Sequence, residues 1–273
     1  MRRVLLWFVP AAVGLATALV FAGAFAAGLS GRLGQPVADE LLPKAAPAPA
    51  ATPGATRIVA LGDSLTRGAG DAAGGYPARV AKALRAKGLA AEVENLGVDG
   101  AETKDLLKKV RDPEVRRRVA ASQLILVSIS GNDLSHSLRS LSTAGAAPET
   151  ESATSPLRTA SENLRSILTA VREANGSAPI RLLGLYSPLP EGLDPRLAKE
   201  TLLKWNVALE EATFTVTGAL VVPTADLFAE RPDRLSADRF HPGPGGYDEI
   251  AARIVATLSA GASAAPSGRQ SAP

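Results

Sequence analysis

The chain has 273 residues, no cysteine and a formal net charge of +3 at pH 7. Without cysteine, disulfides, thiolate metal sites and a lipid-modified cysteine are excluded. Acidic and basic residues alternate along most of the chain, so we expect no nucleic-acid surface.

A long apolar run follows two arginines at the start of the chain and carries no charge before Arg32. At about 1.5 Å per residue, a helix over this run exceeds the roughly 30 Å hydrocarbon core of a bilayer. Residues 1–32 are therefore predicted to be an uncleaved anchor, with signal-peptide cleavage after Ala24 or Ala26 as the alternative. The initial arginines favour a cytoplasmic start, which places the rest of the chain outside the membrane.

Two further segments have compositions that do not build a core. Residues 33–56 are rich in alanine and proline and are predicted to be an extended tether. Residues 261–273 are of low complexity and are predicted to be a disordered tail. Residues 57–260 remain for one α/β domain of ordinary size.

The domain opens with an aliphatic and β-branched run, residues 58–62, that ends at a glycine and is followed by Ser64. Such a run is typical of a central strand in a parallel sheet, which is covered on both faces. Ser64 then lies at the carboxyl end of the strand, where open α/β sheets bind ligands. A serine hydroxyl needs a base, usually a histidine oriented by a carboxylate, before it acts as a nucleophile.

Strands and helices are expected to alternate along the rest of the domain, which predicts a parallel sheet with helices on both faces. We expect the strand order 2-1-3-4-5. The segment 138–155 is predicted to be a long loop, either a lid or a mobile insertion. The other expected strands are residues 92–98, 123–130, 180–186 and 219–223. The expected helices are residues 77–87, residues 103–110, a second helical segment from residue 113, a helix with an apolar stripe over residues 164–171, residues 195–216 and a closing helix over residues 247–258.

The chain contains two histidines, and each stands three residues after an aspartate. Asp238 and His241 belong to a short loop before the closing helix, and the acid can hold its own imidazole in the tautomer that accepts a proton from serine. Asp133 and His136 have the same spacing. Spacing alone therefore does not choose the base.

Acyl transfer also requires hydrogen-bond donors for the oxyanion. The candidates at the carboxyl ends of strands are the N–H of Ser64, the N–H of Gly100 and the side-chain amide of Asn132. If Asn132 faces the oxyanion, its neighbours Asp133 and His136 are expected to be loop or rim residues.

Four sequence blocks occur in one order: GDSLTRG with Ser64, NLGVDGAET with Gly100, GND with Asn132, and DRFHP with His241. In these blocks the chain resembles the SGNH hydrolase (GDSL esterase/lipase) superfamily, and bacterial membrane-associated lysophospholipase-like members in particular. The resemblance spans essentially the whole domain. Gly100 is the glycine carried over from the second block, with Gly97 as the other candidate.

The resemblance implies a flavodoxin-like three-layer α/β/α fold with a five-stranded parallel sheet. It also implies Ser64 as nucleophile, His241 as base, Asp238 as the orienting acid, and no metal or cofactor. Thr66 stands where the G-x-S-x-G turn of α/β-hydrolases needs glycine, which disfavours that fold. Asp63 is interpreted as a local turn acceptor.

These expectations define a serine ester hydrolase, tethered to the membrane with its domain outside, acting on small acyl esters or on acylated lipids such as lysophospholipids. If the N-terminal segment is cleaved, the protein is secreted. A monomer is the expected state. Three alternatives stay open: deacetylation of cell-envelope glycans, acyl transfer to an acceptor other than water, and a non-catalytic glycan- or lipid-binding module. Trp205 and Asn206 are predicted to anchor a helix to the core.

Overall fold

The computed structural model describes residues 54–144, 151–186 and 195–263. The predicted membrane anchor and most of the predicted tether and tail lie outside these ranges. Within the described ranges, no helix combines the length and the apolar character needed to cross a bilayer.

One parallel five-stranded sheet organises the domain, with the strand order β2-β1-β3-β4-β5. The expected order is confirmed, and β1 is flanked by β2 on one side and β3 on the other. The strands are β1 (Thr56–Gly62), β2 (Ala91–Gly97), β3 (Leu124–Ser128), β4 (Ile180–Leu183) and β5 (Ala219–Val222).

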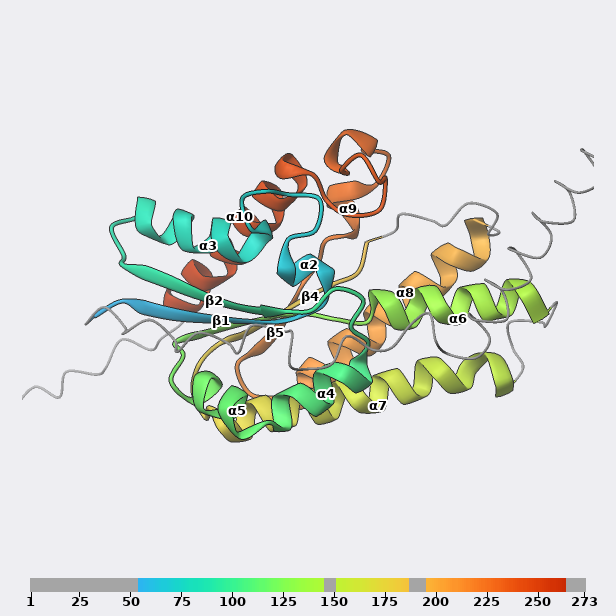
Figure 1. Ribbon diagram of the computed structural model, residues 1–273, viewed down its shortest axis with the longest axis horizontal. Helices are drawn as coiled ribbons and strands as arrows, with labels where there is room; N and C mark the ends of the chain where they lie inside the picture. Colours follow the sequence, from blue (N-terminus) through green and yellow to red (C-terminus); the bar gives the residue numbers. More distant parts are fainter. Residues whose placement is uncertain (1–53, 145–150, 187–194, 264–273) are drawn as a thin grey trace, which may run out of the picture. The chain divides into compact units, whose positions relative to one another are not determined.

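Helices cover both faces of this sheet, as Figure 1 shows. One layer contains α3 (Gly75–Ala86), α9 (Ala225–Phe228) and α10 (Pro244–Ser263), and the short α2 (Ser64–Arg67) lies at the end of β1 on this side. The other layer contains α4 (Thr103–Arg111), α5 (Pro113–Ala120), α6 (Gly131–Ala144), α7 (Glu151–Ala174) and α8 (Pro195–Phe214). The expected three-layer α/β/α arrangement is confirmed.

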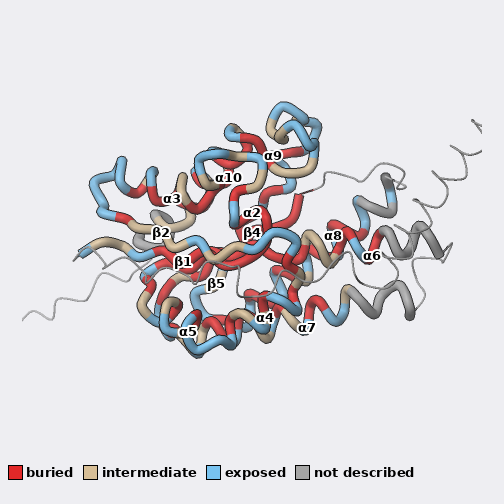
Figure 2. Tube along the Cα trace, in the orientation of Figure 1, coloured by how far each residue is buried: buried red, intermediate tan, exposed pale blue. Residues whose placement is uncertain are grey.

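The central strand shows why both faces need a cover. Ile58 and Ala60 of β1 belong to the core under α3 and α10, whereas Val59 and Leu61 belong to the core under α4 and α7. All four residues are buried, and Figure 2 shows the middle of the sheet mainly in red, the colour of buried residues. An uninterrupted apolar run is therefore required here, because a polar residue on either face would lose its water without gaining a partner.

The prediction of a long loop over residues 138–155 is wrong in its described part. Helix α6 continues to Ala144, and α7 begins at Glu151. Alanine, serine and leucine are compatible with a helix, and Leu134 and Leu138, one turn apart, pack into the core. Asp133 and His136 consequently lie on the first turns of a helix, not on a loop as expected.

The interpretation of Trp205 and Asn206 is confirmed. Trp205 of α8 is 2% exposed and packs in the core. The side-chain oxygen of Asn206 accepts from the Leu185 N–H at 2.8 Å, and its amide nitrogen donates to the Leu185 carbonyl at 3.0 Å. The pair fixes the chain just beyond β4.

Candidate active site

The turn that follows β1 depends on a glycine. Gly62 has a φ of +146°, and a Cβ atom at this position would stand 1.8 Å from the Ser128 carbonyl oxygen. This close approach lets the backbone of β1 hydrogen bond on both sides: the Asp63 N–H donates to Ser128 at 3.1 Å, and the Val98 N–H donates to Gly62 at 2.9 Å. The ends of β2, β1 and β3 therefore meet beside Ser64.

Ser64 is the first residue of α2, and it is buried with 7% of its surface exposed. Asp63 caps this helix, since its side chain accepts from the Leu65 N–H at 3.1 Å. Gly68 ends the helix in the left-handed conformation. The short turn thus holds the serine hydroxyl at a defined position above the sheet, and the predicted turn-acceptor role of Asp63 is confirmed.

Asp63 has a second role that the sequence did not indicate. Its carboxylate also accepts from the Ser128 hydroxyl at 2.9 Å, and Ser128 is 2.6 Å from the Thr66 hydroxyl, which is 2.9 Å from that of Tyr76. Burial raises the pKa of Asp63 to about 6, although the Ser128 and Leu65 hydrogen bonds act in the opposite direction. A titratable buried carboxyl therefore lies directly behind the serine.

The loop of residues 235–242 holds the second half of the site. Leu235 and Pro242 form an antiparallel bridge, and Arg239 between them adopts a φ of +56°. Asp238 accepts four hydrogen bonds inside this loop: from the Ser236 hydroxyl at 2.6 Å, from the N–H groups of Phe240 and His241 at 2.9 Å each, and at 2.7 Å from Nδ1 of the His241 ring.

The ring of His241 connects the two halves. Its Nε2 is 2.9 Å from the Ser64 hydroxyl oxygen, while its Nδ1 faces Asp238. The other histidine does not share this geometry: Nδ1 of His136 contacts Glu102. The structure therefore brings Ser64, His241 and Asp238 into one chain of hydrogen bonds and leaves Asp133 and His136 on a separate helix.

The environment of Asp238 keeps it ionised. Burial by itself would raise the pKa of this carboxyl, but the hydrogen bonds from Ser236, His241 and the Phe240 N–H outweigh it and hold the pKa well below its usual range. An ionised carboxylate on Nδ1 fixes the tautomer in which Nε2 is free to accept a proton.

Two tyrosines that the sequence analysis did not select as site residues support the site: Tyr186 contacts the histidine loop, and Tyr247 contacts the chain just after α2. The Tyr186 hydroxyl, beyond β4, donates to the Phe240 carbonyl at 2.9 Å, and the Tyr186 ring stacks on Phe228 of α9 with centroids 4.0 Å apart. The Tyr247 hydroxyl of α10 donates to Ala69 at 2.7 Å. A single tyrosine after an apolar strand resembles a core residue in sequence, so no signal distinguished Tyr186.

The second block offers two glycines as oxyanion donors, and the structure separates them. The Gly97 N–H donates to the Asn95 side chain at 3.0 Å. Gly100 has a φ of +74°, and a Cβ atom there would meet nothing within 4 Å. Among the described residues no protein acceptor binds the Gly100 N–H, so this group is available to a ligand.

Asn132 lies on the first turn of α6, at the carboxyl end of β3. Its amide nitrogen donates to the Ala101 carbonyl at 2.9 Å, which uses one of its two N–H groups. Among the described residues, no acceptor contacts the second N–H. In the part of the chain that the structure describes, no group of three or more His, Asp or Glu side chains is arranged to hold a metal ion.

Comparison with known proteins gives consistent matches. The model of the GDSL-like Lipase/Acylhydrolase family matches residues 60–249. The uncharacterized protein YpmR of Bacillus subtilis is 31% identical over 208 residues, which cover 74% of this chain and 80% of YpmR. The spore germination lipase LipC of Bacillus licheniformis is 28% identical over 211 residues, 73% of this chain and 95% of LipC.

A solved structure extends the likeness to the whole domain. The crystal structure of the lipase Lip_vut3, from a goat rumen metagenome, superimposes with a TM-score of 0.66 at 25% sequence identity. The match covers 74% of this chain and 96% of the lipase.

Proposed function

We propose that this chain, which belongs to the GDSL-like Lipase/Acylhydrolase family, hydrolyses esters through an acyl-enzyme formed on Ser64. The family identifies it as an SGNH-type carboxylic ester hydrolase. The assignment of residues to roles and the choice of substrate are the parts that we add.

One observation carries the assignment of the nucleophile and base. Nε2 of His241 is 2.9 Å from the Ser64 hydroxyl oxygen, and Asp238 is 2.7 Å from the other ring nitrogen. This is the geometry in which a histidine removes the proton of a serine as the serine attacks. His136 contacts Glu102 instead, so His241 is the base in the proposed mechanism.

In the first half-reaction, the Ser64 oxygen bonds to the ester carbonyl carbon while His241 Nε2 takes the hydroxyl proton. The carbonyl becomes a tetrahedral oxyanion, and its collapse breaks the bond to the alcohol, which leaves with the proton from His241. In the second half-reaction, water gives a proton to His241 and attacks the acyl-enzyme. Collapse releases the carboxylic acid and returns the proton to Ser64.

The oxyanion needs donors that are in place before the reaction. We assign the N–H groups of Ser64 and Gly100 and the free N–H of the Asn132 amide. Two features support this assignment: the three residues follow neighbouring strands of the sheet, and the N–H of Gly100 binds no acceptor among the described residues.

For the substrate we propose acyl esters of lipids, such as lysophospholipids, at the outer face of the membrane. The apolar run at the start of the sequence supports this choice, because an enzyme tethered there by residues 1–32 meets amphiphiles at the surface. The relative LipC is described as a spore germination lipase. No feature of the described residues favours glycan deacetylation over this proposal.

The test is hydrolysis of p-nitrophenyl esters, from acetate to palmitate, by the full chain in detergent micelles. We expect activity that increases toward the longer acyl chains and falls by about 10⁴-fold or more in Ser64→Ala. An optimum at acetate would contradict the lipid substrate. An unaltered rate in Ser64→Ala would contradict the mechanism. Excess ester product with added alcohol would indicate acyl transfer.

A further inference from the structure

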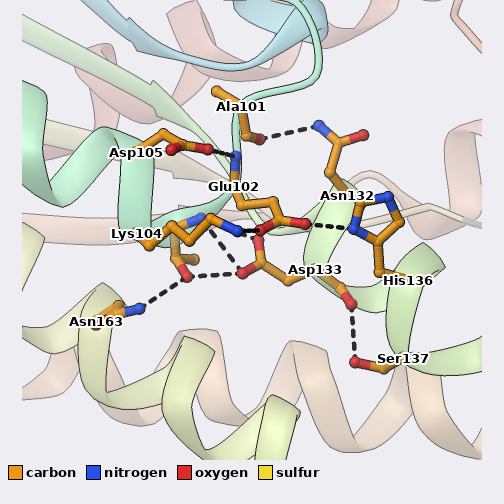
Figure 3. A network of polar contacts seen from close by, with 10 residues as sticks. Ala101, Glu102, Lys104, Asp105, Asn132, Asp133, His136, Ser137 and Asn163 are labelled. Atoms are coloured by element: carbon orange, nitrogen blue, oxygen red, sulfur yellow. Dashed lines mark hydrogen bonds and ion pairs between the residues drawn. The ribbon is translucent and has the colours of Figure 1, made fainter. Parts of the chain in front are cut away.

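The start of helix α6 grips the segment of residues 101–103 that follows Gly100. Figure 3 shows the contacts of Asn132, Asp133 and His136 of α6 with residues 101–103. We call this set of contacts the clamp. Asn132 donates to the Ala101 carbonyl at 2.9 Å. The next residue, Asp133, accepts from the Thr103 N–H at 3.0 Å and from the Thr103 hydroxyl at 2.7 Å. Two consecutive residues of α6 thus hold two residues of the neighbouring turn.

A third contact lies farther out on the same face of α6. Nδ1 of His136 contacts a carboxylate oxygen of Glu102, and Lys104 lies 2.5 Å from the other oxygen. The His136 side chain is 61% exposed, so water screens this pair and the inner contacts dominate. The histidine that matched the catalytic spacing in sequence is therefore part of the clamp.

The contact between Asp133 and Thr103 is less exposed to water than the contact between His136 and Glu102. Thr103 is fully buried and also accepts from the Asn163 amide of α7 at 3.3 Å. Thr103 is the first residue of α4, and the first N–H groups of a helix have no partner within it. Asp133 supplies that partner from another helix, and it ties α6 to the start of α4.

The hydrogen bonds between Asp133 and Thr103 influence the distance between the two proposed oxyanion donors, the Gly100 N–H and the Asn132 amide. Gly100 follows β2 and Asn132 follows β3, so the two proposed oxyanion donors are separated in sequence and not bonded to each other. Gly100 is left-handed and has open space where a side chain would be. Its orientation therefore depends on the residues on either side: before it, the Val98 N–H donates to the Gly62 carbonyl at 2.9 Å, and after it, the clamp holds residues 101–103.

We propose that Asp133 is a positioning residue of the oxyanion hole: its carboxylate holds Thr103 and thereby fixes the Gly100 N–H relative to the Asn132 amide. The inference rests on the proposed function, because it takes Gly100 and Asn132 to be the oxyanion donors. Asp133 touches no reacting atom. It acts by keeping the donors where the oxyanion develops.

The first variant is Asp133→Asn, which keeps the shape of the side chain. In the amide, one of the two carboxylate oxygens becomes an NH2 group, which does not accept a hydrogen bond. Either the Thr103 N–H loses its acceptor at 3.0 Å or the Thr103 hydroxyl loses its acceptor at 2.7 Å, so the contact is weakened. Since a misplacement of about 1 Å costs about 100-fold in rate, we expect kcat to fall by about 10- to 100-fold. We expect KM to stay within about 3-fold, because the donors act on the oxyanion and not on the ground-state ester.

Asp112→Asn is the matched control. Asp112 accepts from the Glu114 and Val115 N–H groups at the start of α5, and this helix leads into the opposite end of β3. The substitution is the same and the carboxylate again accepts hydrogen bonds at the start of a helix, but here both donors are backbone N–H groups of the helix that Asp112 caps, and no proposed oxyanion donor follows this end of β3. We expect its kcat to equal that of the wild type.

A double-mutant cycle separates positioning from general stability. Asn132→Ala removes one proposed donor and should lower kcat by about 10²- to 10³-fold. If Asp133 acts through the donors, adding Asp133→Asn to Asn132→Ala should cost much less than it costs in the wild type. Equal losses in both backgrounds would overturn the inference, and so would an Asp133→Asn variant that behaves like the Asp112→Asn control.

The Thr103 side provides a test that does not depend on the folding of Asp133→Asn. Thr103→Val removes the hydroxyl and keeps the shape, whereas Thr103→Ser keeps the hydroxyl. We expect the valine variant to lose several-fold more kcat than the serine variant, and equal losses would contradict the clamp. An Asn132→Ala variant as active as the wild type would instead overturn the proposed function, and the inference with it.

Discussion

Two aspartate–histidine pairs with identical sequence spacing make different contacts in this domain. In residues 238–241 the acid bonds the ring of its own histidine at 2.7 Å. In residues 133–136 the two side chains turn to separate partners, Thr103 and Glu102. The first pair lies on a tight loop in which Arg239 has a φ of +56°, and the second lies on a regular helix. The backbone, and not the spacing, determines whether the acid and the ring meet.

The surroundings add a second difference. The loop pair is brought against Ser64, whereas the helix pair contacts Glu102 and Thr103, which follow Gly100. One pair therefore handles the proton in the proposed mechanism, and the other holds the backbone that stabilises charge. The predictions that follow challenge this division, beginning with the largest effect.

The largest difference in kcat is expected between the alanine variants of the two histidines. His241→Ala should lower kcat for a p-nitrophenyl ester by about 10⁴-fold or more, because it removes the proposed base. His136→Ala breaks an exposed contact, and such pairs contribute at most about 1 kcal/mol to stability. Even if this whole amount were added to the activation barrier, kcat would fall by only about 5-fold. Steady-state kinetics of both variants checks this. A severe loss in His136→Ala would reverse the assignment of the base.

The next largest difference in kcat is expected between the asparagine variants of the two aspartates. Asp238→Asn leaves an amide on Nδ1 of His241 and favours the wrong tautomer, so kcat should fall by about 10³- to 10⁴-fold. The corresponding change at Asp133 should cost about 10- to 100-fold, as argued for positioning of the donors. The two variants are compared on one substrate at saturation. Equal losses would mean that the pairs are not functionally distinct.

A third carboxyl, Asp63, allows a comparison by stability. Its pKa is raised from 3.8 to about 6 by burial, so the folded state binds the proton more tightly than the unfolded chain. Stability contributed by this group is therefore lost as pH rises from about 4 to 7, by roughly 3 kcal/mol. Asp63→Asn should remove that dependence, so that the variant gains stability relative to the wild type between pH 4 and 8.

Urea unfolding of the wild type and the Asp63→Asn variant at both pH values measures the effect. If the difference in unfolding free energy between the two proteins is the same at pH 4 and pH 8, Asp63 does not titrate as its burial indicates. The hydrogen bond to Ser128 would then hold the carboxylate in its charged form.

The smallest effect distinguishes Asp238 from Asp133 by sign. Hydrogen bonds lower the pKa of Asp238, so the stability it contributes is present above pH 4 and lost at lower pH. Burial raises the pKa of Asp133, so its ionisation costs stability as pH rises above 4. Destabilisation by Asp238→Asn should therefore grow from pH 3 to pH 7, and that by Asp133→Asn should shrink.

Thermal unfolding of both variants from pH 3 to pH 7 shows whether the destabilisation by each substitution grows or shrinks with pH. The effect at Asp238 is limited because its side chain is 47% exposed and water screens its interactions. A common sign for the two variants would contradict the environments described for the two acids.

Much of the fold was predictable from particular residues. The uninterrupted run of β1 predicted a strand covered on both faces. The stripe of Leu164, Ile167, Leu168 and Val171 predicted a helix with one apolar face, and these four residues are at most 1% exposed. The extent of α6 and α7 was missed, because a segment rich in serine, threonine and alanine has the composition of a loop while each residue is still compatible with a helix.

The site was predictable only in part. Ser64, Asp238 and His241 follow from their blocks, and the donors Gly100 and Asn132 from theirs. The support given by Tyr186 and Ser128 was not predictable, since one hydroxyl near the end of an apolar strand has no distinctive pattern. Their importance depends on contacts with the histidine loop and with Asp63, which are distant in sequence.

The sequence by itself determined the order of strands and helices and the position of a serine at the end of the central strand, because apolar runs and glycines act locally. The spacing of the two aspartate–histidine pairs left the base open, and the family resemblance implied His241; only the tertiary structure shows His241 in contact with the serine and His136 in contact with Glu102. Ser64 and His241 are separated by 177 positions, and the crossovers of the sheet bring them to the same edge. The free energy that selects this arrangement comes from burial of both faces of the sheet, a property of the whole domain and of no single block.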